Sequence, residues 1–294
     1  MPLNVPEEDY MHSGHMACPG CGAAIAMRFF LKGLGRKAVI VLPACCWSII
    51  AGAYPQMSLK VPVIHTAFET GGAVASGVRA ALDIRGDTDT TVVTWAGDGG
   101  TFDIGFQSLS GAVERNENFI YVCYDNEAYM NTGVQRSSST PYGAWTTTTP
   151  GRSWKRMRKK NIVEALVAHR IPYAATASIA FPEDMVRKVE KAKGIKGSRF
   201  LHVYTTCPTG WRIPSEISVK IARMAVQTNI FPLYEVEGGT HYRINYRPKE
   251  FPVREYFKLQ GRFRHLSDDD LAEIQAMVTE DWELLLRKAS GVGS

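Results

Sequence analysis

Apolar runs bounded by turn residues alternate with amphipathic segments along most of the chain. This alternation is typical of a parallel β-sheet covered by helices, because buried parallel strands are apolar throughout and each helix carries one apolar stripe. The pattern therefore predicts an α/β fold with a mostly parallel sheet. The predicted strands are residues 38–42, 61–65, 91–96, 119–124, 173–179 and 200–205. The predicted helices are residues 23–34, 72–82, 106–115, 161–169, 182–193 and 215–227.

The pattern changes after residue 231. A hairpin is predicted around Gly238 and Gly239, followed by an extended arm rich in aromatic residues and arginine and then by a last helix. Ser267, followed by three aspartates, is typical of the N-cap of that helix. We divide the chain into a main domain, residues 1–230, and a C-terminal hairpin, arm and helix, residues 231–294. We expect residues 251–289 to dock on another subunit.

Composition narrows the class of protein. The chain has 294 residues, of which 45% are hydrophobic, and its longest apolar stretch, residues 38–55, is too interrupted to span a membrane. The first residues lack the basic and apolar pattern of an export signal, so we expect a cytoplasmic protein with reduced cysteines. The net charge of +5 gives no indication of nucleic-acid binding. A basic segment, residues 152–160, is interpreted as a solvated loop or helix start, or else as a contact for an acidic protein.

One acidic residue lies between glycines at the end of a predicted strand. Asp98 stands in the stretch WAGDGG, and Asn126 follows the next predicted strand. A right-handed crossover would bring both to the same edge of the sheet, where α/β proteins bind ligands. A carboxylate, an amide oxygen and one backbone carbonyl form half of an octahedral Mg²⁺ shell, and two phosphate oxygens and a water would complete it. Gly97, Gly99 and Gly100 would let the backbone approach such a diphosphate. The alternative is that Asp98 only forms a turn.

The cysteines suggest a metal centre. Cys18 and Cys21 are separated by two residues, a spacing that lets both thiolates bind one centre, whereas Cys46 and Cys207 are far away in sequence. At this point the ligands could hold either structural zinc or an iron-sulfur cluster. Cys123 lies within a predicted strand and is interpreted as a core residue.

These motifs together resemble a known family. The segments HMACPGCGAA, PACCWSIIAGAYP, TTCPTGWR and YDNEAYMNTGVQRSSSTP are similar to those of the thiamine-diphosphate-binding β-subunit of pyruvate:ferredoxin and related 2-oxoacid:ferredoxin oxidoreductases. The likeness extends over nearly the whole chain and implies a thiamine-diphosphate-binding fold. One departure from the common motif of thiamine-diphosphate enzymes is that Glu127 replaces the usual second asparagine.

The resemblance implies roles for individual residues. Asp98, Asn126 and the carbonyl of Ala128 would hold Mg²⁺, and Asn131 would hydrogen-bond the reacting centre. A 4Fe-4S cluster would be held by Cys18, Cys21, Cys46 and Cys207, with Cys45 an alternative to its neighbour. The remaining residues implied to contact or flank the cofactor are Trp47, Ile64, His65, Thr66, Ala67, Tyr129, Met130 and Thr132.

The resemblance also implies an activity. Thiamine diphosphate would supply the carbon nucleophile that decarboxylates a 2-oxo acid, expected to be pyruvate; the acyl group would pass to coenzyme A, and electrons would pass through the cluster to ferredoxin. Thiamine must be activated by a carboxylate, for which Glu69 is the best internal candidate, although an acid at a helix start also has a structural use. The resemblance implies that this carboxylate comes instead from a partner α-subunit. We therefore expect a heteromer with α-, γ- and δ-type subunits.

Three alternatives stay open from the sequence. The substrate could be 2-ketoisovalerate or oxalate, since the partner chain would contact much of it. The chain could be a non-catalytic subunit stabilised by zinc. It could also belong to a thiamine-dependent decarboxylase without a redox function.

Overall fold

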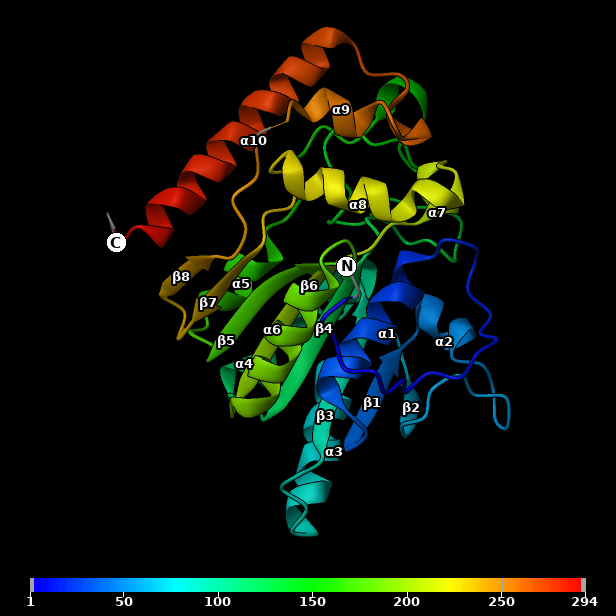
Figure 1. Ribbon diagram of the computed structural model, residues 1–294, viewed down its shortest axis with the longest axis vertical. Helices are drawn as coiled ribbons and strands as arrows, with labels where there is room; N and C mark the ends of the chain where they lie inside the picture. The colour runs from blue at the N-terminus through cyan, green and yellow to red at the C-terminus, as the bar shows by residue number, and fades with distance from the viewer. Residues whose placement is uncertain (1–2, 250, 292–294) are drawn as a thin grey trace.

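An eight-stranded sheet forms the centre of the molecule in the computed structural model, which describes residues 3–249 and 251–291, without the side chain of Arg152. The strand order is β2-β1-β3-β4-β6-β5-β7-β8 (Figure 1). The strands are β1 (Ala38–Pro43), β2 (Val63–Thr66), β3 (Thr91–Gly97), β4 (Phe119–Asp125), β5 (Tyr173–Ser178), β6 (Ser198–Tyr204), β7 (Tyr234–Glu237) and β8 (His241–Ile244). The predicted mostly parallel sheet is confirmed, because β1 to β6 are parallel and only the last two strands pair antiparallel.

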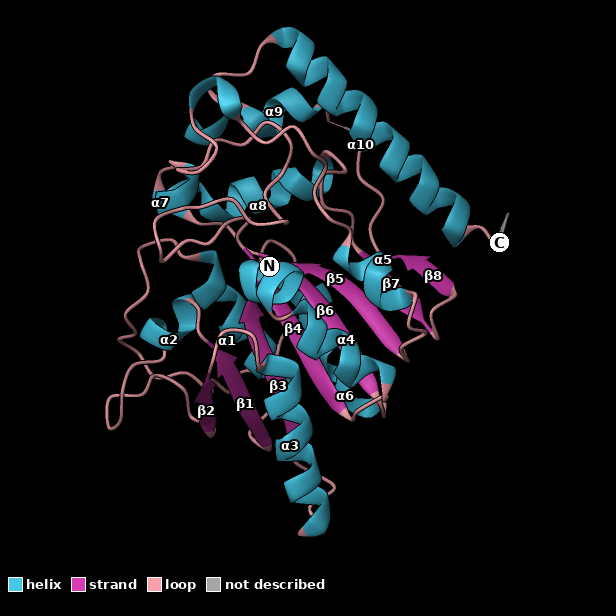
Figure 2. Ribbon diagram, turned by 180° about the vertical axis from the view of Figure 1, so that it is seen from behind, coloured by secondary structure: helices cyan, strands magenta, loops and turns pink. Residues whose placement is uncertain are grey.

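Helices cover both faces of this sheet. They are α1 (Gly22–Leu34), α2 (Cys46–Ile50), α3 (Gly71–Ile84), α4 (Phe106–Glu114), α5 (Ile162–Val167), α6 (Pro182–Gly194), α7 (Pro208–Trp211), α8 (Ser218–Gln227), α9 (Val253–Phe257) and α10 (Asp268–Ala289). α1 and α6 pack on one face (Figure 1), whereas α3, α4 and α5 lie on the other (Figure 2). This double cover explains why β4, β5 and β6 are buried at every position and why their sequences are not alternating.

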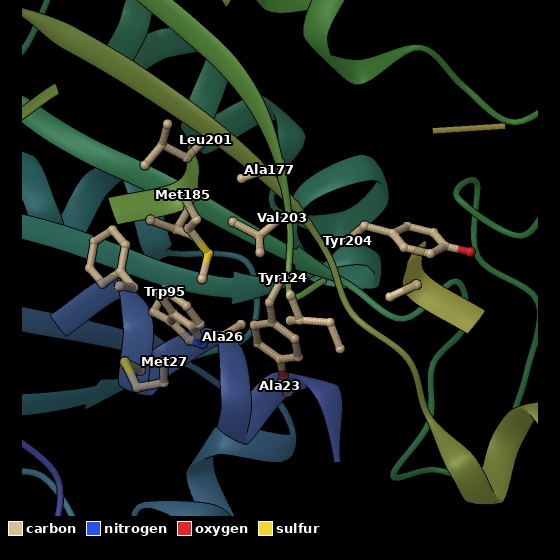
Figure 3. Close-up of a cluster of buried hydrophobic side chains, with 14 of the residues drawn as sticks. Ala23, Ala26, Met27, Trp95, Tyr124, Ala177, Met185, Leu201, Val203 and Tyr204 are labelled. Atoms are coloured by element: carbon tan, nitrogen blue, oxygen red, sulfur yellow. The ribbon is translucent and has the colours of Figure 1, made fainter. Parts of the chain in front are cut away.

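The core is divided by the sheet into two clusters. The cluster under α1, α6 and α8 contains the stacked rings of Trp95 and Tyr124, whose centroids are 5.9 Å apart (Figure 3). The cluster under α3, α4 and α5 also receives Trp282 and Leu285 from α10. The last helix therefore completes the core of the main sheet. The strands β7 and β8, which follow residue 231, belong to this same sheet. The predicted domain ranges also include residues 1, 2, 250 and 292–294, which lie outside the described part.

Most predicted elements occur where the sequence pattern places them. The hairpin at Gly238 and Gly239 joins β7 to β8, and Ser267 caps α10 through its side chain together with Asp270. The helix predicted for residues 215–227 begins with a short 3₁₀ turn before α8. The sequence prediction missed α2, α7 and α9, each of which has five residues or fewer. Such short helices do not carry a detectable apolar period.

No helix in the described part of the chain is both long enough and apolar enough to cross a bilayer.

Candidate active site

The carboxyl ends of β3 and β4 lie next to each other in the middle of the sheet. The two strands pair in parallel, with Gly97 opposite Tyr124, so Asp98 and Asn126 follow directly at the same edge. The predicted right-handed arrangement of the two strands therefore brings both side chains together. Asp98 also begins a short π-helix (Gly99–Ile104), which leads into α4 and was not predicted.

Oxygen atoms of three residues converge at this edge. One terminal atom of the Asn126 side-chain amide lies 2.9 Å from the carbonyl oxygen of Ala128 and 3.1 Å from Asp98 Oδ1. If the amide nitrogen occupies this position, it donates hydrogen bonds to both acceptors. If the amide oxygen occupies it, three oxygens face one another, which is the donor set that a hard divalent cation takes. The residues present therefore fit Mg²⁺.

Asp98 is a buried acid with little compensation. Its side chain accepts a hydrogen bond of 2.6 Å from the Ser137 hydroxyl at Oδ2, and the residue is only 1% exposed. Burial and the nearby charge of Asp125 raise the pKa of Asp98 well above its ordinary value, against the opposing effects of Ser137 and Lys159. A cation bound beside this carboxylate would supply the missing positive charge.

Asp125 lies only three positions from Ala128 and has the opposite environment. Its carboxylate contacts Lys159 Nζ at 2.6 Å and His202 Nε2 at 2.7 Å, and it accepts hydrogen bonds from Ser139 Oγ. Burial alone would raise the pKa of Asp125, but Lys159 and His202 together lower it below its ordinary range. Asp125 is therefore a compensated structural charge.

A cavity of about 280 Å³ opens beside these oxygens. Most of the residues predicted to bind the cofactor line it: Cys46, Gly97, Asp98, Gly99, Gly100, Asn126, Ala128, Tyr129, Met130, Asn131 and Thr132. Cys45, the predicted alternative to Cys46, also lines it, together with residues that were not predicted, which are Ala44, Ser48, Ile49, Phe68 and Tyr124. Ile64 and Ala67 do not line this cavity, and neither do three other predicted residues, Trp47, His65 and Thr66.

These three residues have other surroundings in the chain. Trp47 is completely buried, and its indole nitrogen donates to the Ala23 carbonyl at 3.3 Å. His65 is exposed on the edge strand β2, and the Thr66 hydroxyl lies 2.6 Å from that of Thr70. A cofactor contact by His65 or Thr66 stays a prediction. Trp47 is positioned to support α2.

Close packing requires glycine at position 99. A Cβ atom on Gly99 would lie 2.3 Å from the Tyr129 ring, closer than real Cβ contacts allow. The Tyr129 hydroxyl in turn donates to Asp103 Oδ2 at 2.9 Å. The glycine thus allows Tyr129 to pack against the start of the π-helix and to line the cavity.

The predicted cysteine ligands come from three separate elements that meet near this cavity. Cys18 and Cys21 form a turn before α1, Cys46 begins α2, and Cys207 caps α7. The Gly22 amide donates to the Thr206 carbonyl at 3.0 Å, which joins the first segment to the last. Burial, followed by the charges of Cys45, Cys207 and Cys21, raises the pKa of Cys46 to about 12, so these thiols are electrostatic neighbours.

The separation of these thiols distinguishes two kinds of centre. Within the described residues, no three His, Cys, Asp or Glu side chains lie close enough to hold one metal ion. A 4Fe-4S cluster places each thiolate at a different iron, so its ligands are farther apart than those of a single zinc ion. Among the described residues these thiols do not form a site for a single ion, and a 4Fe-4S cluster at them stays a prediction.

The adjacent cysteines have different roles in the fold. The Cys45 side chain caps α2 in a reciprocal contact with Ser48, and its Cβ lies near Gly97. Cys46 instead is the one whose pKa is affected by Cys207 and Cys21. Cys45 thus contributes to the start of α2, and Cys46 as the fourth cluster ligand stays a prediction.

The basic segment differs from its sequence interpretation. Lys155 is buried and Lys159 is partly buried, and Lys155 Nζ donates to the carbonyl oxygens of Ser138 and Thr140. Lys160 Nζ donates to the Phe102 carbonyl. The interpretation as a solvated loop is therefore wrong for Lys155, whereas Lys159 is partly buried and Lys160 is exposed. The alternation of basic residues with Trp154 and Met157 gave no signal of this burial.

Comparisons with known proteins agree with this geometry. The family described as "Thiamine pyrophosphate enzyme, C-terminal TPP binding domain" matches residues 45–203. The ketoisovalerate oxidoreductase subunit VorB of Pyrococcus furiosus is 51% identical, covering 99% of this chain and 97% of that protein. The pyruvate synthase subunit PorB of Methanocaldococcus jannaschii is 49% identical, covering 96% of this chain and 98% of that protein.

A solved structure shares the fold. It is the 2-oxoglutarate:ferredoxin oxidoreductase from Magnetococcus marinus, with a TM-score of 0.59 at 22% identity, covering 76% of this chain and 84% of that one. The match over the full length of the two relatives and the match to the cofactor-binding domain together identify the family. The chain belongs to the thiamine-diphosphate-binding β-subunits of the 2-oxoacid:ferredoxin oxidoreductases.

Proposed function

We propose that this chain is the thiamine-diphosphate- and cluster-binding subunit of a complex that oxidatively decarboxylates a 2-oxo acid, with pyruvate as the substrate. The products are acyl-coenzyme A and carbon dioxide, and ferredoxin receives the electrons. The observation that carries this proposal is that one cavity is lined by the three oxygen donors and also by Cys46. A site for a diphosphate-bound cation and a site for a one-electron carrier would thus be adjacent.

The oxygen donors are proposed to hold Mg²⁺. Asp98, Asn126 and the carbonyl of Ala128 would be the protein ligands, with Ser137 orienting the carboxylate of Asp98. When bound, thiamine diphosphate supplies a carbon nucleophile and accepts the electrons released with carbon dioxide. Asn131 lines the same cavity and is proposed to hydrogen-bond the reacting centre.

The cysteines are proposed to hold one 4Fe-4S cluster. Cys18, Cys21, Cys46 and Cys207 would each bind an iron as the thiolate. Burial, followed by the charges of Cys21 and Cys18, raises the pKa of Cys207 to about 11, and a bound iron ion would stabilise the charged form. The thiols require a reducing compartment, which supports the cytoplasm as the site of action.

The site is proposed to be completed by other subunits. Among the residues that line the described cavity, Asp98 is the sole carboxylate, and it is assigned to the metal. Asn131 and Thr132 are exposed in the isolated chain, so a second chain can cover them. We infer that an α-type subunit provides the activating acid, and that γ- and δ-type subunits complete the complex and its path to ferredoxin. Coenzyme A is the proposed acyl acceptor.

Anaerobic purification of the complex from native cells tests the proposal. Iron, thiamine, magnesium and subunit composition are measured on the same sample, and turnover is assayed with ferredoxin, coenzyme A and either pyruvate or 2-ketoisovalerate. We expect iron, thiamine and higher turnover on pyruvate. Higher turnover on 2-ketoisovalerate would reassign the substrate, whereas zinc without iron or thiamine would support the non-catalytic scaffold instead.

A further inference from the structure

Glu127 lies between two of the proposed Mg²⁺ ligands and has an unusual backbone conformation. Its φ angle is +68°, in the left-handed region that asparagine and aspartate tolerate better than glutamate does. Contacts elsewhere in the chain must therefore hold glutamate in place.

The Glu127 side chain is buried among charges of opposite sign. The residue is 2% exposed, and its carboxylate contacts Arg262 Nη2 at 2.5 Å and Lys159 Nζ at 3.0 Å. Lys159 also contacts Asp125, so two acids and two bases form one buried, charge-balanced group. Burial alone would lower the pKa of Lys159, but Asp125 and Glu127 raise it above its ordinary value. Each member depends on the others for compensation.

Arg262 connects this group to the C-terminal region. It lies in the short helical turn between α9 and α10, the two helices above the carboxyl ends of the strands (Figure 1). Its guanidinium lies 3.9 Å from the centroid of the Trp211 ring, and the Trp211 indole nitrogen donates to the Asn126 carbonyl at 2.8 Å. Arg262 therefore touches the ligand loop twice, directly through Glu127 and indirectly through Trp211.

The backbone of the loop is fixed by the same neighbours. The Glu127 amide donates to Asp125 Oδ1 at 2.9 Å, and its carbonyl accepts from the Thr140 hydroxyl at 2.7 Å. These contacts turn the Asn126 side chain and the Ala128 carbonyl toward the same point. The left-handed residue between them is the position at which the loop would relax if its side chain lost its partners.

We propose that Glu127 is a positioning residue, held by Arg262 and Lys159, that keeps the Asn126 and Ala128 oxygens in place for Mg²⁺ without binding the ion itself. This inference rests on the proposed function. It extends the site to the C-terminal region, whose Arg262 acts on the metal loop across the interior of the chain. The buried charges are thus proposed to hold the metal ligands in position, in addition to stabilising the fold.

The test is Glu127→Gln in the intact complex, with Glu235→Gln as the matched control. Glu235 is also a buried glutamate, paired with Lys191 and Arg243, but it lies on β7 away from the cavity. Magnesium titration at saturating thiamine diphosphate is followed by tryptophan fluorescence. We expect half-saturation of Glu127→Gln to require about 10- to 100-fold more Mg²⁺, as for the loss of other orienting partners, and no change for Glu235→Gln.

Two results would overturn the proposal: unchanged Mg²⁺ affinity in Glu127→Gln, or an equal loss in Glu235→Gln. If Glu127→Gln does not assemble, Arg262→Lys decides, because lysine keeps the charge but cannot both contact Glu127 and cover Trp211 as the planar group does. Weaker Mg²⁺ binding by this variant supports the proposal, and unchanged binding refutes it. The variant Asp98→Ala distinguishes failure of the Glu127 proposal from failure of the proposed function. If Asp98→Ala binds Mg²⁺ and the cofactor as the parent does, the proposed function itself is wrong.

Discussion

Replacing Asp98 by asparagine should stabilise the cofactor-free protein while it removes metal binding. The two side chains have the same shape, so the Ser137 hydroxyl can still donate to an oxygen at position 98. The new amide nitrogen would face the Asn126 amide atom that now lies 3.1 Å from Asp98 Oδ1. The substitution would thereby place a hydrogen-bond donor at position 98, where the aspartate carboxylate has only acceptors.

The size of the expected rise in the free energy of unfolding follows from the poor electrostatic compensation of the buried Asp98 carboxylate. In the described part of the chain, no salt bridge reaches this buried carboxylate, and the charge of Asp125 adds to the cost of its burial. Removing a poorly compensated buried polar charge is worth about 1–3 kcal/mol, so the free energy of unfolding should rise by that amount in the absence of ligand. Metal affinity should fall by roughly a thousandfold, since a carboxylate leaves a small ligand shell.

The assay is thermal unfolding of the intact complex, stripped of Mg²⁺ and thiamine diphosphate and then resupplied with both. Parent protein at a ligand concentration about 100 times its dissociation constant should gain about 2.7 kcal/mol. Asp98→Asn should begin with a higher melting temperature and gain almost nothing from the ligands. Asp125→Asn is the matched control: it removes an equally buried but paired carboxylate and should cost about 3–5 kcal/mol. A lower melting temperature for ligand-free Asp98→Asn, or a full ligand-induced gain, would refute the reasoning.

Three further predictions concern other parts of the chain. Cys46→Ser should lose iron, measured by metal analysis and visible absorbance, whereas Cys45→Ser should keep it; the opposite pattern would exchange their roles. Asn131→Ala should keep its affinity for thiamine diphosphate but show a lower kcat, and a changed affinity with normal kcat would count against its role at the reacting centre. Burial would raise the pKa of Glu235, but its hydrogen-bonding and cationic partners lower it to about 2. Its contribution, up to about 3 kcal/mol, should therefore be complete above the ordinary glutamate pKa and be lost as the pH falls toward 2, which denaturation curves of parent and Glu235→Gln would measure.

The sequence predicts the parts of this site that depend on neighbouring strands. Apolar runs locate β3 and β4, and the handedness of the crossover puts Asp98 and Asn126 at one edge. The glycines around Asp98 were also informative, because the Gly99 backbone must pass close to the Tyr129 ring. Local pattern and strand topology are sufficient for these features.

The supporting contacts could not be predicted in the same way. Ser137 is 39 residues from Asp98 in sequence, and Arg262 is 135 residues from Glu127. The run SSST after the metal loop contained a usable signal, since three of its hydroxyls bond to acceptors near the site. Lys159 carried no such signal, because a lysine in a basic run is usually solvated, and only the fold shows that two acids enclose it.

The contrast between the two buried aspartates identifies the functional one. Asp125 has a lysine, a histidine and a serine around it, whereas Asp98 has a serine and the Asn126 amide beside it and no salt bridge among the described residues. A folded chain that can surround one carboxylate with cations could stabilise the other in the same way. Among the described residues it leaves Asp98 without a salt-bridge partner, at a cost to the ligand-free protein, and the proposed binding of Mg²⁺ would recover that cost. The stability of the ligand-free state and the affinity for the metal are therefore opposed at this residue, and the opposite signs expected for Asp98→Asn and Asp125→Asn follow directly.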